Sequence, residues 1–109
     1  MEKKVFTIFD NYPVNKGHML IIPKRHYSDF FETSPEELEQ IFNLLHQAKE
    51  KLDKLYSPDG YNIGINNGKA AGQTIMHLHI HLIPRYDGDT DDPRGGVRHI
   101  IEELVPYKG

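Results

Sequence analysis

The stretch "GQTIMHLHIHLIPR", residues 72–85, places a histidine at every second position, at His77, His79 and His81. The residues between and just after them are apolar: Leu78, Ile80 and Leu82. Because side chains of an extended strand alternate between its two faces, residues 74–84 are predicted to form a strand with all three imidazoles on one face. The apolar face is then expected to pack on a helix, which leaves the imidazoles open for chemistry.

The simplest interpretation of this histidine row is structural: a half-buried strand whose polar face happens to carry histidine. A single histidine would usually mean no more than that. Three imidazoles in one row argue against it, because each buried imidazole needs its own hydrogen-bond partners.

A second interpretation is a metal site, because imidazole is a good ligand for zinc, iron and copper. Such a site normally takes a further ligand from elsewhere in the chain, which His18, His26 or His99 could supply. The residues alone leave a metal-binding enzyme open as an alternative.

A third interpretation is nucleophilic attack on phosphorus, since a neutral imidazole is a competent nucleophile near neutral pH. The loop "NNGKAAGQT", residues 66–74, directly precedes the row and is rich in small residues. Its backbone N–H groups can approach a phosphate, and Asn66, Gln73 and Thr74 add neutral donors. The loop lacks the GxxxxGK[ST] pattern and is therefore not a P-loop.

Two further segments read as strands near the N-terminus. Residues 5–9 and 18–23 are apolar, and the turn-forming "DNYPVNKG" lies between them, so they are predicted to form a hairpin that ends at Pro23. The connector at residues 24–32 is expected to contain a short helical turn. Residues 61–66 alternate in polarity and are predicted to form another strand.

The longest predicted element is a helix that begins after Ser34 and stops at "SPDG", residues 57–60. Ser34 and Glu37 match a capping box, and Pro35 falls at the first helical position, where its missing N–H costs nothing. The apolar residues recur at helical spacing and are expected to form one core-facing stripe: Leu38, Ile41, Phe42, Leu45, Ala48, Leu52 and Leu55. A hairpin, a helix and further antiparallel strands indicate an α+β fold.

The composition limits the class of protein. With 109 residues the chain is expected to form one domain, residues 1–109, in which residues 86–109 are a variable C-terminal tail. The absence of cysteine excludes disulfides and thiolate catalysis, and the net charge of −3 argues against a nucleic-acid partner. Neither a signal-peptide pattern nor a membrane-length apolar run is present, so we expect a cytoplasmic protein without a membrane partner.

Three segments resemble the histidine triad (HIT) superfamily. "HLHIHLIP", residues 77–84, fits its H-φ-H-φ-H-φ-φ signature, where φ is apolar. "FDNYPVNKGHMLIIPKRH", residues 9–26, resembles its hairpin, and "NNGKAAGQTIMHLHIHLIPR", residues 66–85, resembles its active-site loop and strand. The resemblance covers roughly residues 5–86 and implies a HIT-like fold: an antiparallel sheet with one long amphipathic helix and a short connector helix.

The resemblance also implies a function and the residues that perform it. HIT proteins bind nucleotides and attack the α-phosphate with the middle histidine, forming a covalent nucleotidyl-histidine that water then hydrolyses. By this resemblance His79 is the nucleophile, His81 contacts the phosphate and assists, and His77 orients its neighbours. His18 packs into the same histidine network. The implied substrate contacts are Asp10, at the ribose hydroxyls, and Asn66, Gly72, Gln73 and Thr74, at the phosphate or the bridging leaving oxygen. Phe6 and Ile8, with Leu20 or Ile22, are expected to line the base pocket.

Within the superfamily, His81 favours the hydrolases, because the nucleotidyltransferase and phosphorylase branches typically carry Gln there. "AGQT" and "PR" around the strand resemble the fragile-histidine-triad branch, which cleaves dinucleoside polyphosphates, more than the Hint-type phosphoramidases. The resemblance further implies a homodimer with no metal in the catalytic site, so that magnesium enters only with a polyphosphate substrate. A nucleotide-binding interaction module with little turnover is the remaining alternative.

Two features depart from the family pattern. Many bacterial HIT proteins begin with a Cys-x-x-Cys zinc segment, and this chain contains no cysteine. Residues 87–109 have no clear family counterpart, although this region often shapes substrate choice. The leaving group is therefore left open by the sequence.

Overall fold

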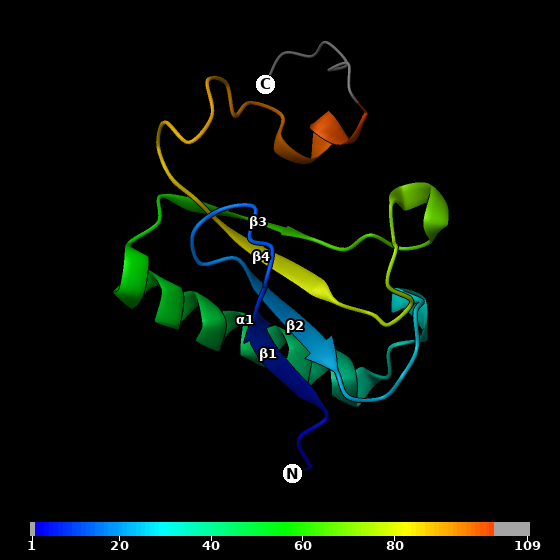
Figure 1. The fold of residues 1–109 in the computed structure, drawn as a ribbon. Coiled ribbons are helices and arrows are strands. Elements are labelled where there is room, and N and C mark those ends of the chain that lie inside the picture. The colour runs from blue at the N-terminus through cyan, green and yellow to red at the C-terminus, as the bar shows by residue number, and fades with distance from the viewer. Residues whose placement is uncertain (1, 102–109) are drawn as a thin grey trace.

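The computed structural model describes residues 2–101. Within that range one antiparallel sheet has the strand order β1-β2-β4-β3, and a single long helix, α1, lies against one of its faces (Figure 1). The strands are β1 (Val5–Phe9), β2 (Met19–Pro23), β3 (Gly60–Gly64) and β4 (Ile80–Arg85), and α1 spans Pro35–Tyr56. Three short 3-10 helices complete the elements: η1 (Phe30–Glu32), η2 (Lys69–Ala71) and η3 (Gly96–Ile100). The predicted α+β architecture is confirmed: an antiparallel sheet, one long helix and the short connector helix η1.

The N-terminal hairpin forms as predicted, with Phe6 opposite Ile22 and Ile8 opposite Leu20. Its turn closes at Gly17, whose φ of +89° is one that only glycine adopts without strain. A Cβ at this position would come within 2.9 Å of the Tyr56 ring, so the turn also depends on a missing side chain. This hairpin sets His18 at the start of β2.

Helix α1 begins with the predicted capping box. The Glu37 N–H donates to Ser34 Oγ at 3.1 Å, and the Ser34 N–H donates to Glu37 Oε1 at 2.9 Å. The buried Glu37 carboxylate also accepts from Arg25 at 2.8 Å, and this guanidinium lowers the pKa of Glu37 to about 2. The helix ends at Ser57, which adopts the left-handed conformation with φ of 47°.

The predicted stripe on α1 is wrong in part. Ile41, Ala48 and Leu52 are buried, whereas the large side chains of Leu38, Phe42 and Leu55 are exposed. Helix α1 makes most of its strand contacts with β1 and β2, and on its β3-facing side Phe42 borders an open groove beside Tyr61 and Ile63. Phe42 is left 62% exposed on that side.

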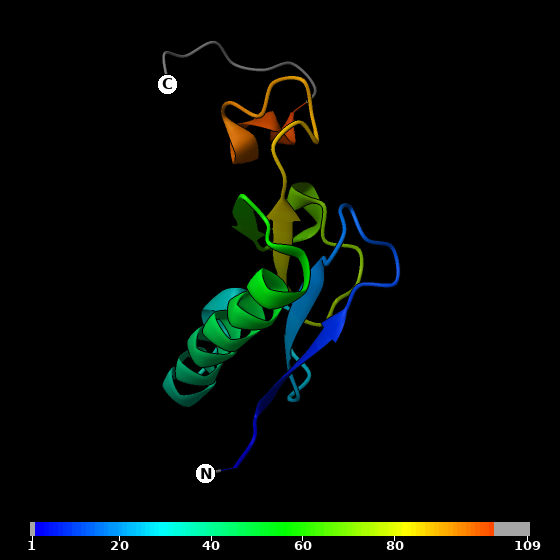
Figure 2. The ribbon, with the colours of Figure 1, turned by 90° about the vertical axis from the view of Figure 1, so that its left-hand side faces the viewer.

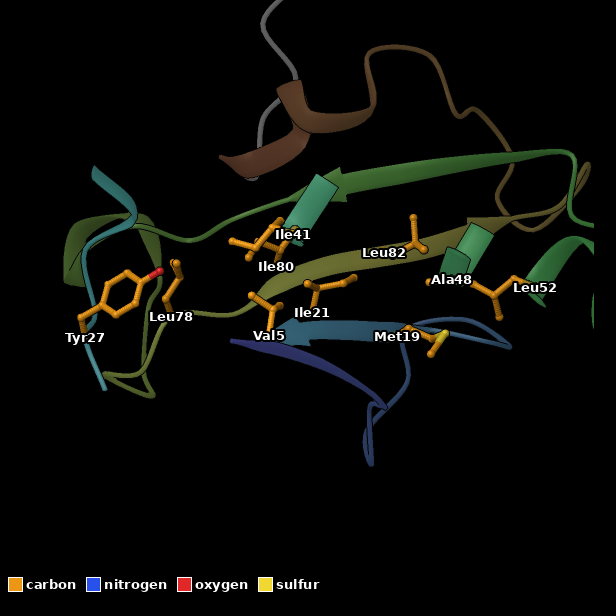
Figure 3. Close-up of a cluster of buried hydrophobic side chains, with 10 residues drawn as sticks. All are labelled: Val5, Met19, Ile21, Tyr27, Ile41, Ala48, Leu52, Leu78, Ile80 and Leu82. Carbon is orange, nitrogen blue, oxygen red and sulfur yellow. The ribbon is translucent and has the colours of Figure 1, made fainter. Parts of the chain in front are cut away.

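The hydrophobic core lies between α1 and the sheet (Figure 3). Leu78, Ile80 and Leu82 are all fully buried in it, as the alternation in the histidine row predicts. The three histidines of the row are only half-buried, on the opposite side of the chain. The polarity pattern therefore assigns the two faces correctly.

The predicted strand over residues 74–84 is too long at its start, because β4 begins only at Ile80. The partner strand explains this limit. The β2–β4 register, with Ile21 opposite Ile80, would next bring Pro23 toward Leu78, and proline has no N–H to continue the ladder. The Leu78 N–H donates instead to the Tyr27 carbonyl at 2.7 Å, so residues 77–79 belong to no strand, and His77 lies in a bend.

The tail that follows β4 leads to η3, at the end of the molecule where β3 and β4 lie (Figure 2). Within the predicted variable tail, η3 ends at Ile100, and residues 102–109 lie outside the described range. None of the helices described, α1 included, is both long enough and apolar enough to cross a membrane.

Candidate functional site

The sheet face turned away from α1 carries two adjacent hollows that share His81. The first, here the β1/β2 hollow, has a volume of about 390 Å³ and is lined by Phe6, Ile8, Asp10, Leu20, Ile22, Ile75, His77, His79 and His81. The second, here the β3/β4 hollow, has a volume of about 350 Å³. All four apolar residues expected around a base, Phe6, Ile8, Leu20 and Ile22, thus lie in the same hollow as the histidine row.

The hydrogen bond of His79 decides which of its nitrogens is reactive. Its Nδ1 lies 2.9 Å from the carbonyl oxygen of His77. A carbonyl oxygen can only accept, so Nδ1 must carry the proton. In the neutral ring Nε2 is then unprotonated, and no hydrogen bond formed within residues 2–101 occupies it. His79 therefore presents a nucleophilic lone pair at the β1/β2 hollow.

His81 has the opposite tautomer, and a chain of hydrogen bonds enforces it. The Val14 N–H donates to His18 Nδ1 at 3.0 Å, so the proton of neutral His18 sits on Nε2. That Nε2–H faces His81 Nδ1 at 2.9 Å and donates to it. The remaining proton of His81 is consequently on Nε2, which makes His81 a hydrogen-bond donor next to the lone pair of His79.

Burial keeps both rings of this inner pair, His18 and His81, in the neutral form. His18 is 2% exposed, and desolvation lowers its pKa although Asp10 raises it. Desolvation also lowers the pKa of His81, with further lowering by His79 and His18 and an opposing effect of Asp10. Neutral rings preserve the tautomers on which the site depends.

Asp10 lies where β1 ends and borders the same hollow. One carboxylate oxygen accepts from the Tyr12 N–H at 2.9 Å, and the other lies 3.5 Å from His18 Nε2. The second oxygen retains the capacity to accept from a substrate hydroxyl.

Asp10, His18 and His81 each place one potential metal-ligating atom within 4.8 Å of the others. The donor set nevertheless does not fit a metal ion. A metal-bound imidazole normally donates from its second nitrogen, whereas the second nitrogen of His18 accepts from the Val14 N–H. Binding at Nε2 would therefore require a doubly deprotonated ring.

The remaining histidine of the row, His77, forms an outer pair with His26, which the sequence suggested only as a possible metal ligand beside the row. His77 Nε2 donates to the Pro23 carbonyl at 2.7 Å, and its Nδ1 lies 2.9 Å from Nδ1 of the exposed His26. His99, the other suggested partner, instead donates from Nε2 to the Arg94 carbonyl at 2.7 Å.

Gln73 lies in the loop before the histidine row. Its side chain holds this loop, whereas the sequence predicted that it contacts the phosphate directly. Gln73 is 4% exposed; its Oε1 accepts from the Gly68 N–H at 2.8 Å, and its Nε2 donates to the Ser28 and Ile75 carbonyls. These bonds use the side chain to hold the loop. Gly72, with φ of +95°, and Thr74 are exposed, while Asn66 borders the β3/β4 hollow.

Asn67 was missed by the sequence reasoning and ties this loop to the connector. Its Oδ1 accepts from the Phe30 N–H at 2.7 Å, and its Nδ2 donates to Asp29 at 3.2 Å. The only signal in the sequence was the doubled asparagine before Gly68, which reads equally well as an ordinary turn.

Comparison with known proteins places this geometry in context. The HIT domain profile matches residues 1–88. The chain is 46% identical over 106 residues to an uncharacterized HIT-like protein of Methanocaldococcus jannaschii, covering 95% of this chain and 81% of that protein.

Two more distant relatives have named activities. An adenylylsulfatase of Arabidopsis thaliana is 42% identical over 82 residues, and an asymmetrical bis(5′-nucleosyl)-tetraphosphatase of Schizosaccharomyces pombe is 38% identical over 77 residues. The matches cover 75% and 71% of this chain but only 42% of each relative.

Among solved structures, a HIT family protein from Bacillus anthracis superposes with a TM-score of 0.74 at 41% identity. That match covers 79% of this chain and 61% of the other. The shared fold spans most of the described residues of this chain and under two thirds of the Bacillus protein.

Proposed function

The chain belongs to the HIT domain family, and from that premise we propose that it is a hydrolase that cleaves a nucleotide at its α-phosphate through a covalent nucleotidyl-histidine. The proposal rests on one observation: the unprotonated Nε2 of His79 and the protonated Nε2 of His81 belong to residues that line the same hollow. A nucleophile beside a hydrogen-bond donor is what displacement at phosphorus needs.

In the first half of the proposed reaction, His79 Nε2 forms a bond to the α-phosphorus while the bond from phosphorus to the leaving group breaks. His81 donates a hydrogen bond from Nε2–H to the departing atom, which takes up a proton from a water molecule and leaves hydroxide behind. In the second half, this hydroxide forms the new bond to phosphorus and the N–P bond breaks, which returns His79 to its neutral form. The products are a nucleoside monophosphate and the protonated leaving group.

The walls of the β1/β2 hollow suit the nucleoside half of such a substrate. Phe6, Ile8, Leu20 and Ile22 offer apolar contact for a base, and Asp10 can accept from ribose hydroxyls. We assign phosphate contacts to Gly72, Thr74 and Asn66, and we assign Gln73 the task of shaping their loop. The two relatives with named activities are an adenylylsulfatase and a bis(5′-nucleosyl)-tetraphosphatase, so more than one leaving group occurs among proteins similar to this one. The proposal covers phosphoanhydride and phosphoramidate substrates.

The test is His79→Ala against adenosine phosphoramidate and diadenosine polyphosphates. Loss of the nucleophile should lower kcat by at least about 10³-fold while nucleotide binding stays within a few-fold. Rapid quenching followed by intact-mass spectrometry should find one nucleotidyl adduct on the wild-type protein and none on the variant.

His46→Ala, on the exposed side of α1, is the matched control and should retain wild-type turnover. An adduct that persists in His79→Ala would reject His79 as the nucleophile. Tight nucleotide binding by the wild-type protein with negligible turnover of every substrate would instead support an interaction module.

We also propose that the catalytic site holds no resident metal, because His18 and His81 are committed to each other and to the Val14 N–H. Magnesium would then enter only with a polyphosphate substrate. Hydrolysis of a substrate with an uncharged leaving group should continue in the presence of a chelator. A stoichiometric metal whose removal abolishes this hydrolysis would contradict the proposal.

Finally, we propose that the protein is a homodimer that buries the exposed edge of β3. This strand pairs only with β4 among the described residues, and a mostly apolar groove of about 330 Å³ runs beside it between Phe42, Leu45, Tyr61 and Ile63. Ile63 is 54% exposed there. Sedimentation should show a dimer that Ile63→Glu converts to a monomer; a wild-type monomer at micromolar concentration would contradict the proposal.

A further inference from the structure

We propose that Asp89, in the tail that follows β4, is a positioning residue that holds the turn between β1 and β2, and that through this turn it fixes the tautomers of His18 and His81. This inference rests on the proposed function, because it gives Asp89 a part in preparing the hydrogen-bond donor of His81 for the reaction. Asp89 lines neither the β1/β2 hollow nor the β3/β4 hollow, so it acts through other residues.

The sequence after β4 places Asp89 beside the end of its own strand. Residues 86–89 form a turn in which the Asp89 N–H donates to the Tyr86 carbonyl at 3.0 Å. Gly88, the third residue of this turn, has a φ of +84°, which glycine adopts without strain. The turn brings the Asp89 side chain back to Arg85, four residues earlier, and leaves only 14% of that side chain exposed.

Four donors occupy the Asp89 carboxylate. Arg85 donates to Oδ1 at 2.8 Å and to Oδ2 at 2.9 Å. Oδ2 also accepts from the Tyr86 N–H at 2.9 Å and from the Asn15 side-chain amide at 2.8 Å. A carboxylate has about four acceptor positions, so these donors use its capacity. The hydrogen bonds, those from Arg85 above all, hold the pKa of Asp89 well below its usual range, so the group stays ionised and transfers no proton.

The bond to Asn15 connects the tail to the turn between β1 and β2, 74 residues away in the chain. The Asn15 amide also donates to the Pro84 carbonyl at 3.2 Å, so its side chain is held by two groups near the end of β4. A second bond acts in the same way, because the Tyr86 hydroxyl donates to the Lys16 carbonyl at 2.8 Å. The tail thus holds two successive residues of the turn.

The turn in turn supplies the group that assigns the tautomers. The Asn15 carbonyl accepts from the His18 N–H at 3.1 Å, and the neighbouring Val14 N–H donates to His18 Nδ1 at 3.0 Å. The side chains of this segment contribute little packing, since Tyr12 is 88% exposed and Val14 is 75% exposed. Hydrogen bonds therefore have to keep the Val14 N–H against the buried ring.

The tautomers of His18 and His81 are coupled, because one proton lies between their facing nitrogens. In the arrangement described above, His18 Nε2–H donates to His81 Nδ1. In the reverse arrangement His81 Nδ1–H donates to His18 Nε2, and the proton of His18 is on Nδ1. The Val14 N–H disfavours the reverse arrangement, because two donors would then face each other at His18 Nδ1. If the Val14 N–H moves away, the reverse arrangement becomes populated, and His81 Nε2 has no proton to offer at the hollow.

The tail contains a second pair of an aspartate and an arginine that lacks this connection. Arg94 donates to the Asp92 carboxylate from Nε at 3.0 Å and from Nη2 at 3.0 Å. This pair is open to solvent, because the side chains of Asp92 and Arg94 are 51% and 75% exposed. Within residues 2–101 the hydrogen bonds to the Asp92 carboxylate all come from Arg94, so Asp92→Ala is the matched control.

The first experiment measures the tautomers directly, in the protein without substrate at neutral pH. NMR spectra that correlate ring C–H protons with ring nitrogens distinguish a protonated nitrogen from an unprotonated one. In the wild-type protein and in Asp92→Ala, His18 and His81 should each show a protonated Nε2 and an unprotonated Nδ1. In Asp89→Ala and in Asn15→Ala the shifts of the two nitrogens should move toward each other, as expected for a mixture of tautomers.

Steady-state kinetics on adenosine phosphoramidate gives the second readout. Asp89→Ala and Asn15→Ala should each lower kcat by about tenfold, with KM within about twofold, because the hydrogen-bond donor is disordered but the nucleotide contacts remain. The double variant should be no slower than the slower single variant, since the two residues act through one contact. Asp89→Asn keeps one acceptor oxygen and should give an intermediate kcat, and Asp92→Ala should match the wild-type protein.

Unchanged nitrogen shifts of His18 and His81 in both single variants would overturn the assignment of Asp89, as would the same change of shifts in Asp92→Ala. Mixed tautomers with wild-type kcat would overturn the part given to Asp89 in the reaction. If Asp89→Ala fails to fold, Asn15→Ala decides by the same readouts, because it leaves the pair of Arg85 and Asp89 intact. No turnover of any substrate by the wild-type protein would reject the proposed function, and the NMR comparison would still decide whether Asp89 sets the tautomers.

Discussion

Two pairs of histidines in this protein have nearly the same geometry and opposite consequences. The inner pair, His18 and His81, and the outer pair, His26 and His77, each join two nitrogens at 2.9 Å. Their ring centroids lie 5.1 and 5.0 Å apart, with interplanar angles of 50° and 48°. What differs is the backbone group at the end of each chain of hydrogen bonds.

In the inner pair the series of hydrogen bonds begins at a backbone donor, the Val14 N–H. Each ring therefore accepts at Nδ1 and carries its proton on Nε2, so the last N–H of the series is that of His81 Nε2. In the outer pair a backbone acceptor, the Pro23 carbonyl, ends the chain and consumes the last proton of His77. The same pairing therefore leaves an N–H of His81 available at the hollow, whereas it ties His77 to the backbone.

Substitution of His81, in the inner pair, should have the largest effect on kcat. His81→Ala removes the hydrogen-bond donor to the leaving group and should lower kcat by about 10²–10³-fold. His77→Ala, in the outer pair, should lower kcat by less than about tenfold, because the carbonyl that orients His79 is part of the backbone. Steady-state kinetics on one phosphoramidate measures both, and equal losses would contradict the distinction.

Substituting the other member of each pair, His18 or His26, should give a smaller difference in kcat between the two pairs. His18→Ala removes the group that sets the tautomer of His81 and should lower kcat by about ten- to a hundredfold with little change in KM. His18→Gln retains an N–H donor and should restore part of kcat, which a purely structural role would not predict.

The outer counterpart, His26→Ala, alters an exposed side chain and should leave kcat within about threefold. Its free energy of unfolding should change by less than about 0.5 kcal/mol. A His26→Ala defect as large as that of His18→Ala would show that the two pairs act alike.

The smallest effect concerns stability in mild acid. Burial lowers the pKa of His18 and of His81 below 6.5, so the unfolded chain binds more protons than the folded protein between the lowered pKa values and 6.5. Their contribution to stability is fully present above about pH 6.5 and is lost as the pH falls toward the lowered values. Chemical unfolding from pH 7 to 5 should show a shallower decline in His18→Asn, and an unchanged slope would argue against buried neutral rings.

Several parts of the fold were predictable because local chemistry decides them. The capping box depends on the neighbours Ser34 and Glu37, and the turn depends on the positive φ of Gly17, which glycine adopts without strain. The alternation that buries Leu78, Ile80 and Leu82 depends only on the period of an extended chain. These features were read correctly from the sequence for that reason.

Other features depend on partners far away in the chain and could not be read in the same way. β4 begins at Ile80 because its neighbour ends at Pro23, and Phe42 is exposed because it borders an open groove on the β3-facing side of α1. Gln73 was expected at the phosphate, yet it is buried against carbonyls that include Ser28, 45 residues away. A polar residue in a loop shows its chemistry but not which partner it will meet.

The sequence by itself determined that three imidazoles share one side of an extended segment, that a loop of small residues precedes them, and that a helix covers the other side. Only the tertiary structure decided which nitrogen of each ring carries a proton. His18 and His81 are separated by 63 residues, and the Val14 N–H and the His77 carbonyl that assign the tautomers are backbone groups oriented by the fold. Residue type supplies an imidazole, whereas the position of its proton depends on what the folded chain places beside it.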